Sequence, residues 1–250
     1  MAMDVFLAMT AAEIYGKQNL PANLGWMACH FSPYGTGLSN LPKQLPAASL
    51  LIVDDITPIR GHDPQHILDQ LADCAERFRC RGILLDFQRP GIEETSSLVE
   101  ILAKALPYPL AVSSVYASAA SCAICLPPVP PSEPPEDWFS PWNDREIWLE
   151  VSSEGEEICV TEDGSTSIPV PFPAASEPEF HEEALCCHYS ICPEDDKIKF
   201  LLRRTKEDLS DLLKLAESFG VTTAVGLYQE FQQHKNSSSL SLSGGRNYSI

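Results

Sequence analysis

Asp86 and Gln88 are the residues whose types and spacing point most directly to chemistry. They lie in the stretch GILLDFQRPG (82–91), where an apolar run gives way to polar residues. Side chains two positions apart on a β-strand share a face, so this carboxylate and this carboxamide would project together from a strand end. A carboxylate can accept a proton or hold a hydroxyl group, whereas a carboxamide forms hydrogen bonds but has no titrating proton.

Other polar and aromatic residues follow the apolar runs of the chain. The carboxylates that could act with Asp86, in acid–base chemistry or in ligand contact, are Asp54, Asp55 and Glu230. The aromatic residues that could stack on a ligand are Tyr228, Tyr116, Tyr189 and Trp26. All of these side chains can meet only if the elements that carry them end at one place.

Eight short apolar runs supply the predicted strands. They cover 4–10, 25–31, 49–55, 82–88, 108–116, 121–128, 184–191 and 222–231. Most are continuously apolar, which is typical of parallel strands buried on both faces. Amphipathic helices are predicted between several of them, over 63–79, 95–106 and 205–220, each with Asp or Thr as its N-cap. This alternation predicts an irregular α/β fold, a (β/α)8 TIM-like barrel whose strand ends converge on one site.

The region between the predicted sixth and seventh strands departs from the alternation. A Pro-rich stretch (126–142) leads into the alternating residues 145–164, which predict a β-hairpin that turns at Glu154-Gly155. We therefore predict a single domain over 1–233 with an insertion at about 127–178. Residues 234–250 are of low complexity and predict a flexible tail.

The residues around Asp86 resemble a known motif. The stretch CRGILLDFQ (80–88) is similar to the fourth-strand signature D-G-x-D-x-D-x-E of chitinase-type (family 18) glycoside hydrolases. With Gly82 on the family's Gly, Asp86 falls on the last Asp and Gln88 on the terminal Glu, while Arg81 and Leu84 replace the other two Asp residues. The last run, AVGLYQEF (224–231), is similar to the family's closing strand, and Tyr228 takes the place of the aromatic floor of the sugar site. The family's Met-x-Tyr-Asp pattern on the sixth strand is absent.

This resemblance implies a degenerate glycoside-hydrolase-like barrel. In the family the Glu protonates the departing sugar oxygen, and the Asp two residues earlier holds the substrate's N-acetyl group. Gln88 cannot deliver that proton, and Leu84 removes a carboxylate that would tune Asp86. The resemblance therefore implies a non-catalytic protein that binds a carbohydrate without a cofactor, with Asp86 and Gln88 as hydrogen-bonding groups and the aromatic residues as stacking surfaces.

Three other interpretations remain open from the sequence. The protein could be an active glycoside hydrolase with relocated carboxylates, pairing Asp86 with Asp54, Asp55 or Glu230. The Asp86–Gln88 pair could instead be structural and satisfy loop backbone at the top of the barrel. Finally, the aromatic residues of the insertion could form a protein-interaction surface rather than pack on the barrel; they are Trp138, Phe139, Trp142 and Trp148.

Charge and cysteine content narrow the classes of partner. The formal net charge of −18 argues against nucleic acid and anionic membranes as partners, because such a surface repels phosphates. The first residues lack a basic region, and no apolar run is long enough to span a membrane, so we expect a cytoplasmic protein. The nine cysteines are then expected to be reduced. Two groups of residues contain the types that ligate zinc, namely Cys122 with Cys125, and Cys186, Cys187, His188 and Cys192. Both groups lie on predicted strands, where the side chains point in different directions, so we predict that neither binds a metal.

Overall fold

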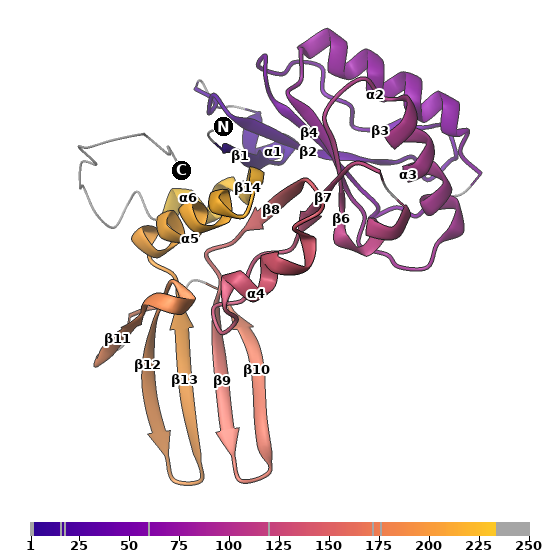
Figure 1. Ribbon diagram of the computed structural model, residues 1–250. Helices are drawn as coiled ribbons and strands as arrows, with labels where there is room; N and C mark the ends of the chain where they lie inside the picture. Colours follow the sequence, from indigo (N-terminus) through magenta and orange to yellow (C-terminus); the bar gives the residue numbers. More distant parts are fainter. Residues whose placement is uncertain are drawn as a thin grey trace.

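Eight parallel strands form a closed barrel in the computed structural model, which describes residues 3–233 apart from 16, 18, 60, 120, 172 and 176 (Figure 1). The barrel strands are β1 (Asp4–Met9), β2 (Leu24–Phe31), β4 (Leu50–Asp54), β5 (Gly82–Asp86), β6 (Leu110–Ser113), β7 (Ala123–Leu126), β8 (Ile147–Val151) and β14 (Val221–Leu227). β1 pairs with both β14 and β2, which closes the sheet. A short strand, β3 (Leu38–Ser39), lies antiparallel to the end of β2. The predicted α/β barrel class is confirmed.

The strands are apolar on both faces because each face meets a core. On β5, Leu84 belongs to the cluster inside the barrel, whereas Ile83 and Leu85 belong to the larger cluster outside it. Trp148 of β8 fills the interior beside Gly82. A Cβ atom at position 82 would lie 3.0 Å from the Trp148 ring, so glycine leaves the room that the indole occupies. The barrel is therefore filled by side chains rather than hollow.

Helices follow several of the strands, and two of the predicted helices are confirmed. They are α2 (Pro64–Phe78), capped by Asp63, and α5 (Lys206–Ser218), capped by Thr205. The other helices are α1 (Ala11–Ile14), α3 (Glu93–Ala105), α4 (Pro135–Phe139) and α6 (Tyr228–Gln233), with 3-10 turns η1 (Ser114–Ala119), η2 (Ser140–Trp142) and η3 (Glu183–Leu185).

The predicted start of the second helix, α3, was wrong. The helix begins at Glu93, and no side chain caps it. Thr95, the expected cap, is 1% exposed inside the first turn. Its hydroxyl group therefore lies within the helix rather than at the position that caps the terminus.

The seventh barrel strand was also misplaced by the sequence pattern. Residues 147–151 form this strand and pair parallel with β7 and β14, although the alternation of 145–164 predicted an antiparallel hairpin. The predicted strand over 184–191 belongs instead to a separate sheet. The insertion therefore lies between the seventh and eighth barrel strands, not between the sixth and seventh, and its sheet follows β8 from Gly155 on rather than following the sixth strand.

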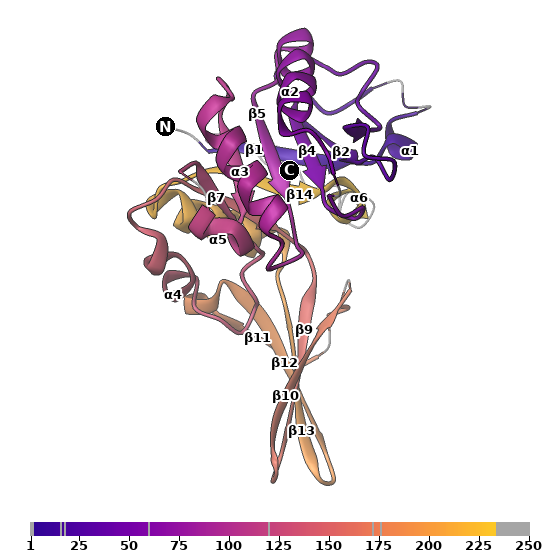
Figure 2. The same ribbon diagram turned by 90° about the vertical axis from the view of Figure 1, so that its right-hand side faces the viewer.

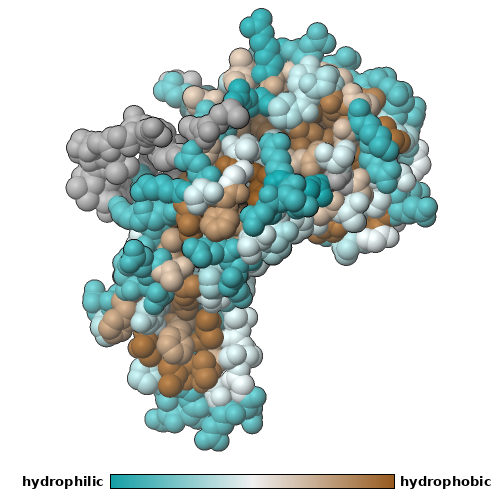
Figure 3. Space-filling view, in the orientation of Figure 1, coloured by the Kyte–Doolittle hydropathy of each residue, from teal (hydrophilic) through white to brown (hydrophobic). Residues whose placement is uncertain are grey.

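This separate sheet has five antiparallel strands and projects from the barrel (Figures 1 and 2). Its strands are β9 (Gly155–Thr161), β10 (Gly164–Val170), β11 (Glu179–Glu182), β12 (Cys187–Glu194) and β13 (Lys197–Arg203), in the order β10-β9-β13-β12-β11. The hairpin turn falls at Glu162 and Asp163, not at Glu154-Gly155. Hydrophobic residues gather over the sheet in Figure 3, and the strand register places Val160, Ile191 and Ile198 on one face.

The aromatic residues before the sheet pack onto the barrel. Phe139 is fully buried and contacts Phe219 with ring centroids 5.7 Å apart, and Trp148 lies inside the barrel. Trp138 and Trp142 are partly buried against the outer core. Two of these four side chains are therefore buried and two are half-buried against the barrel, which favours packing over the interaction surface.

All nine cysteines are free thiols, and Cys122 and Cys125 belong to different hydrophobic clusters. Among the described residues, no helix combines the length and hydropathy that a membrane span requires. The predicted tail over 234–250 lies outside the described residues.

Candidate functional site

A cavity of about 320 Å³ opens at the end of the barrel where the parallel strands terminate. Side chains from the interior cluster form its apolar part, namely Ala8, Met27, Ile52, Leu84 and Val225. Four carboxyl groups also line it, and they belong to Asp86, Glu150, Glu154 and Glu230. Active sites of (β/α)8 barrels form at this end, so the cavity occupies the expected place.

Asp86 faces this cavity because it follows Leu84 by one strand period on β5. Gln88 is exposed and donates its side-chain amide to Asp86, with 2.5 Å between Nε2 and Oδ1. Burial raises the pKa of Asp86, the hydrogen bond from Gln88 opposes this rise, and the charges of Asp54 and Asp55 add to it. The structure therefore brings the two residues together, with Asp86 as the one that contacts the cavity.

Glu150 is the site residue that the sequence analysis missed. It shares the inner face of β8 with Trp148 and lines the cavity. Burial raises the pKa of Glu150 from 4.5 to about 7, and the negative charge of Asp86 adds to the shift. The signal in the sequence was IWLEV (147–151), in which the carboxylate follows a large aromatic residue by one strand period. It was overlooked because this stretch was assigned to a hairpin.

Two of the predicted carboxylates hold loops at the barrel mouth. Asp55 is 5% exposed and accepts the backbone N–H groups of Gln88 and Arg89 at 3.0 and 2.9 Å. Glu230 lines the cavity but accepts hydrogen bonds from Ser152 Oγ at 2.9 Å and from the Ser153 backbone at 2.7 Å. Both groups therefore satisfy backbone donors after β5 and β8.

Asp54 lies at the end of β4, paired in register with Asp86 on β5 and with His30 on β2. Its Oδ1 accepts the backbone N–H of Ile56 at 3.0 Å. Burial raises the pKa of Asp54, while this hydrogen bond and the neighbouring His30 lower it. Asp54 thus sits at the rim beside Asp86 rather than among the residues that line the cavity.

The four predicted stacking residues lie away from the cavity lining. Trp26 is 3% exposed in the outer core and donates its Nε1–H to the backbone of Asn40. Tyr116 is also buried and hydrogen-bonds the backbone of Arg89. Tyr189 lies in the projecting sheet, stacked on Phe180, with ring centroids 5.4 Å apart.

At the end of β14, Leu227 lines the cavity where the resemblance placed Tyr228. The Tyr228 ring instead packs beneath the ammonium group of Lys17, 3.6 Å from the ring centroid. None of the described residues that line the cavity is aromatic. Contact with a ligand ring would therefore come from aliphatic side chains.

No family model and no curated protein matches the sequence. The fold is similar to that of the Bacillus cereus spore cortex-lytic enzyme SleL, with a TM-score of 0.57 and 11% identity over 97% of this chain and 76% of that one. It is also similar to a chitinase-like agglutinin from Robinia pseudoacacia (TM-score 0.56, 10% identity, 88% and 93% coverage). A family GH18 chitinase from Cycas revoluta in complex with allosamidin gives a TM-score of 0.54 at 9% identity, with 90% and 94% coverage. The resemblance to chitinase-type barrels is therefore confirmed for the fold. At this level of identity the likeness shows the fold and not the function.

Proposed function

We propose that the barrel mouth binds a carbohydrate through the carboxyl groups of Asp86 and Glu150. One observation carries this proposal. The two carboxyl groups, on β5 and β8, line the same cavity, and partial burial raises the pKa of both. Perturbed carboxyl groups that converge in a cleft are typical of functional sites. The similar folds include both chitinases and an agglutinin, so a barrel of this shape serves cleavage in some proteins and is a lectin-like scaffold in another.

The chemistry of the two groups suits a neutral, hydroxyl-rich ligand. A protonated carboxyl group both donates and accepts hydrogen bonds, as a sugar hydroxyl does, and the raised pKa of Glu150 keeps part of it protonated near pH 7. The aliphatic floor formed by Leu84 and Leu227 can pack against the C–H face of a sugar ring. The volume is near the lower end of the roughly 300–1,000 Å³ found for ligand pockets. A single sugar unit or the end of a chain therefore fits better than an internal segment of a polymer.

Hydrolysis by the mechanism of the chitinase family is not expected. Gln88 occupies the position of the acid, has no proton to transfer and uses its amide to bond Asp86. Leu84, where the family has a further carboxylate, is 2% exposed and belongs to the apolar interior. The binding proposal therefore includes no turnover by Asp86 and Gln88.

A second candidate function, hydrolysis with relocated carboxylates, is favoured by one observation. Glu150 has a pKa of about 7, which is the property of a general acid that works near neutral pH. Asp86 would then be the second carboxylate of the pair. Asp55 and Glu230 are less suited to this role because each already accepts two or more hydrogen bonds from loop residues.

The test combines binding and turnover on four proteins. Binding of N-acetylglucosamine oligomers is measured by calorimetry, and cleavage is measured with fluorogenic derivatives, for wild type, Asp86→Asn, Glu150→Gln and the control Glu100→Gln on the outer surface of α3. We expect wild type and control to bind equally, both mouth variants to bind at least tenfold more weakly, and no protein to cleave.

Cleavage by wild type that is lost in Glu150→Gln would establish the hydrolase instead. Binding that is equal in all four proteins, or absent from all of them, would contradict the proposed site.

A further inference from the structure

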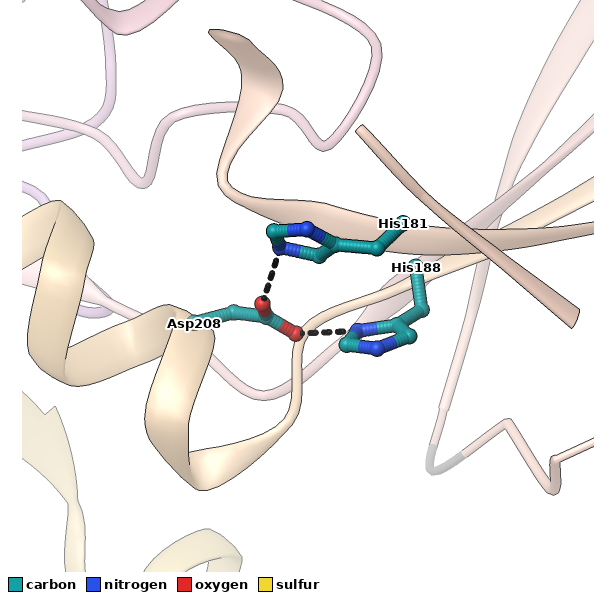
Figure 4. Close-up of side chains that lie close together, drawn as sticks. All are labelled: His181, His188 and Asp208. Carbon is teal, nitrogen blue, oxygen red and sulfur yellow. Dashed lines mark hydrogen bonds and ion pairs between the residues drawn. The ribbon is translucent and has the colours of Figure 1, made fainter. Parts of the chain in front are cut away.

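Two histidines and an aspartate come together where the projecting sheet meets the start of α5, and none of the three lines the cavity at the mouth (Figure 4). His181 on β11 lies directly opposite His188 on β12, with ring centroids 4.7 Å apart. Asp208, in the first turn of α5, reaches both rings. Its Oδ1 lies 3.1 Å from His181 Nε2, and its Oδ2 lies 2.8 Å from His188 Nδ1. Two neighbouring strands and the first turn of α5 therefore bring polar atoms close together.

We propose that this cluster binds one divalent transition-metal ion of the zinc type. One ligand atom from each of the three residues lies within 4.8 Å of the other two. Zinc bonds to imidazole nitrogen and carboxylate oxygen are about 2.0–2.2 Å long, so the ligand atoms of a tetrahedral site are roughly 3.3–3.6 Å apart. The ligand atoms, which lie within 4.8 Å of one another, would reach that spacing by rotation of the side chains on binding. Two imidazoles and one carboxylate form a donor set that zinc accepts, with a fourth position left for water.

The carboxylate is already oriented by other residues. Asp208 Oδ2 accepts hydrogen bonds from the backbone N–H and the hydroxyl group of Thr205, at 2.8 and 2.7 Å. The Asp208 side chain is only 3% exposed, so these bonds keep it fixed. Hydrogen bonds from neighbouring groups to a ligating side chain are typical of metal sites, where they fix the orientation of that side chain. Oδ1, directed toward His181, remains available to an ion.

The charges around the cluster also permit a cation. Arg203 on β13 is the cross-strand partner of His188 and would repel a metal if its charge were unbalanced. Its guanidinium group is paired in bidentate fashion with Glu179, at 2.6 and 2.7 Å. With neutral imidazoles the cluster then carries the charge of Asp208, which favours a divalent cation.

The ion has a route to the site and a structural consequence. The His181 side chain is 47% exposed, so an ion and a water ligand can reach the cluster from solvent. A metal held there would connect β11 and β12 of the projecting sheet to α5 of the barrel. In the sequence His188 stands beside Cys186, Cys187 and Cys192, and its pairing with His181 and Asp208 appears only in the fold.

A binding experiment on the full chain tests the proposal. Zinc binding is measured by calorimetry for wild type, His181→Gln and His188→Gln. His66→Gln, which removes an exposed histidine on α2, is the matched control, and Cys192→Ser removes the exposed thiol of β12. We expect one ion per wild-type chain, at least tenfold weaker binding in both cluster variants, and no change in the two controls. Cobalt-loaded protein should show nitrogen and oxygen coordination without a thiolate-to-cobalt band.

A thermal measurement separates a metal site from a purely hydrogen-bonded one. Zinc should raise the melting temperature of wild type and of both controls, because an ion that binds only the folded state stabilises it, and should not raise that of the cluster variants. If the cluster only caps α5, its variants lose stability equally with and without zinc. Equal zinc binding by wild type and cluster variants, or no binding by wild type at about millimolar zinc, would overturn the proposal.

Discussion

Gln88 donates a hydrogen bond to Asp86 at the barrel mouth, with 2.5 Å between Nε2 and Oδ1. The residue that the resemblance sets on the family's catalytic Glu therefore acts as a hydrogen-bond donor to the carboxylate beside it. This bond lowers the pKa of Asp86, against the larger opposing effect of burial. Gln88 thus favours the ionised form of a carboxyl group that its surroundings push toward the neutral form.

Replacing Gln88 with Glu should make stability more sensitive to pH. The substitution removes a donor from Asp86 and adds a like charge, so the folded-state pKa values of the pair rise above their unfolded values. Stability is then retained at low pH and lost as the pH rises through the folded-state values. We expect a deficit of about 1 kcal/mol relative to wild type at pH 8, and a smaller one at pH 4. Urea denaturation at both pH values measures it, and a deficit that is larger at pH 4 would contradict the argument.

The variant Glu150→Gln should be more stable than wild type in alkaline buffer. In the folded protein the pKa of Glu150 is about 7, against 4.5 for an ordinary glutamate. Above pH 7 the group must ionise inside the barrel mouth, and the glutamine variant avoids this cost of up to about 3 kcal/mol. The gain should shrink as the pH falls from 7 and vanish near pH 4.5, where the carboxyl group is protonated in both states. A stability difference that does not change between pH 4.5 and 8 would show that Glu150 is not desolvated.

Trp148→Ala tests whether residues 147–151 form a barrel strand. The indole is 3% exposed among the interior side chains, so its removal leaves a cavity and should cost about 3–5 kcal/mol. Trp142→Ala, at a partly buried position on the outer surface, should cost clearly less and is the matched control. Equal effects of the two substitutions on the melting temperature would favour the hairpin that the sequence pattern predicted.

The barrel class followed from the sequence because most strands and several helix caps carry local signals. Continuous apolar runs such as SLLIVDD mark strands buried on both faces, and Asp63 with Pro64 marks a helix start. The misplaced strand shows the limit of such signals. IWLEV alternates because Trp148 fills the interior and Glu150 reaches the mouth, and ALCCHYSI is apolar although it forms part of an antiparallel sheet.

The site was predictable only in part. Asp86 could be placed because it ends a recognisable strand, and it lines the cavity as expected. Glu150 was not predicted because residues 147–151 were assigned to a hairpin. A side chain can be placed at the barrel mouth only when its strand is assigned to the barrel. Tyr116 and Trp26 were expected at the mouth, but both are buried in the outer core. An aromatic residue near a strand end can face either the mouth or the core, and the sequence does not distinguish the two positions.

Introducing the two acidic residues of the family motif, with Leu84→Asp and Gln88→Glu together, should fail to create a hydrolase. From sequence alone this pair looks like the shortest route to that motif. In the structure Leu84 is 2% exposed among Phe6, Ile52 and Val225, and an aspartate there would be desolvated without a partner. Such a substitution costs several kcal/mol unless the group stays protonated, and a protonated residue cannot supply the missing charge.

We expect Leu84→Asp, alone or with Gln88→Glu, to lower the melting temperature strongly at pH 7 and less at pH 4, with no cleavage of fluorogenic N-acetylglucosamine oligomers. The matched variant Leu84→Asn separates charge from lost packing, because it removes the same volume and should destabilise equally at both pH values. A folded double variant that cleaves the substrate at pH 7 would show that the barrel interior accommodates the charge and that two substitutions are enough to give hydrolysis.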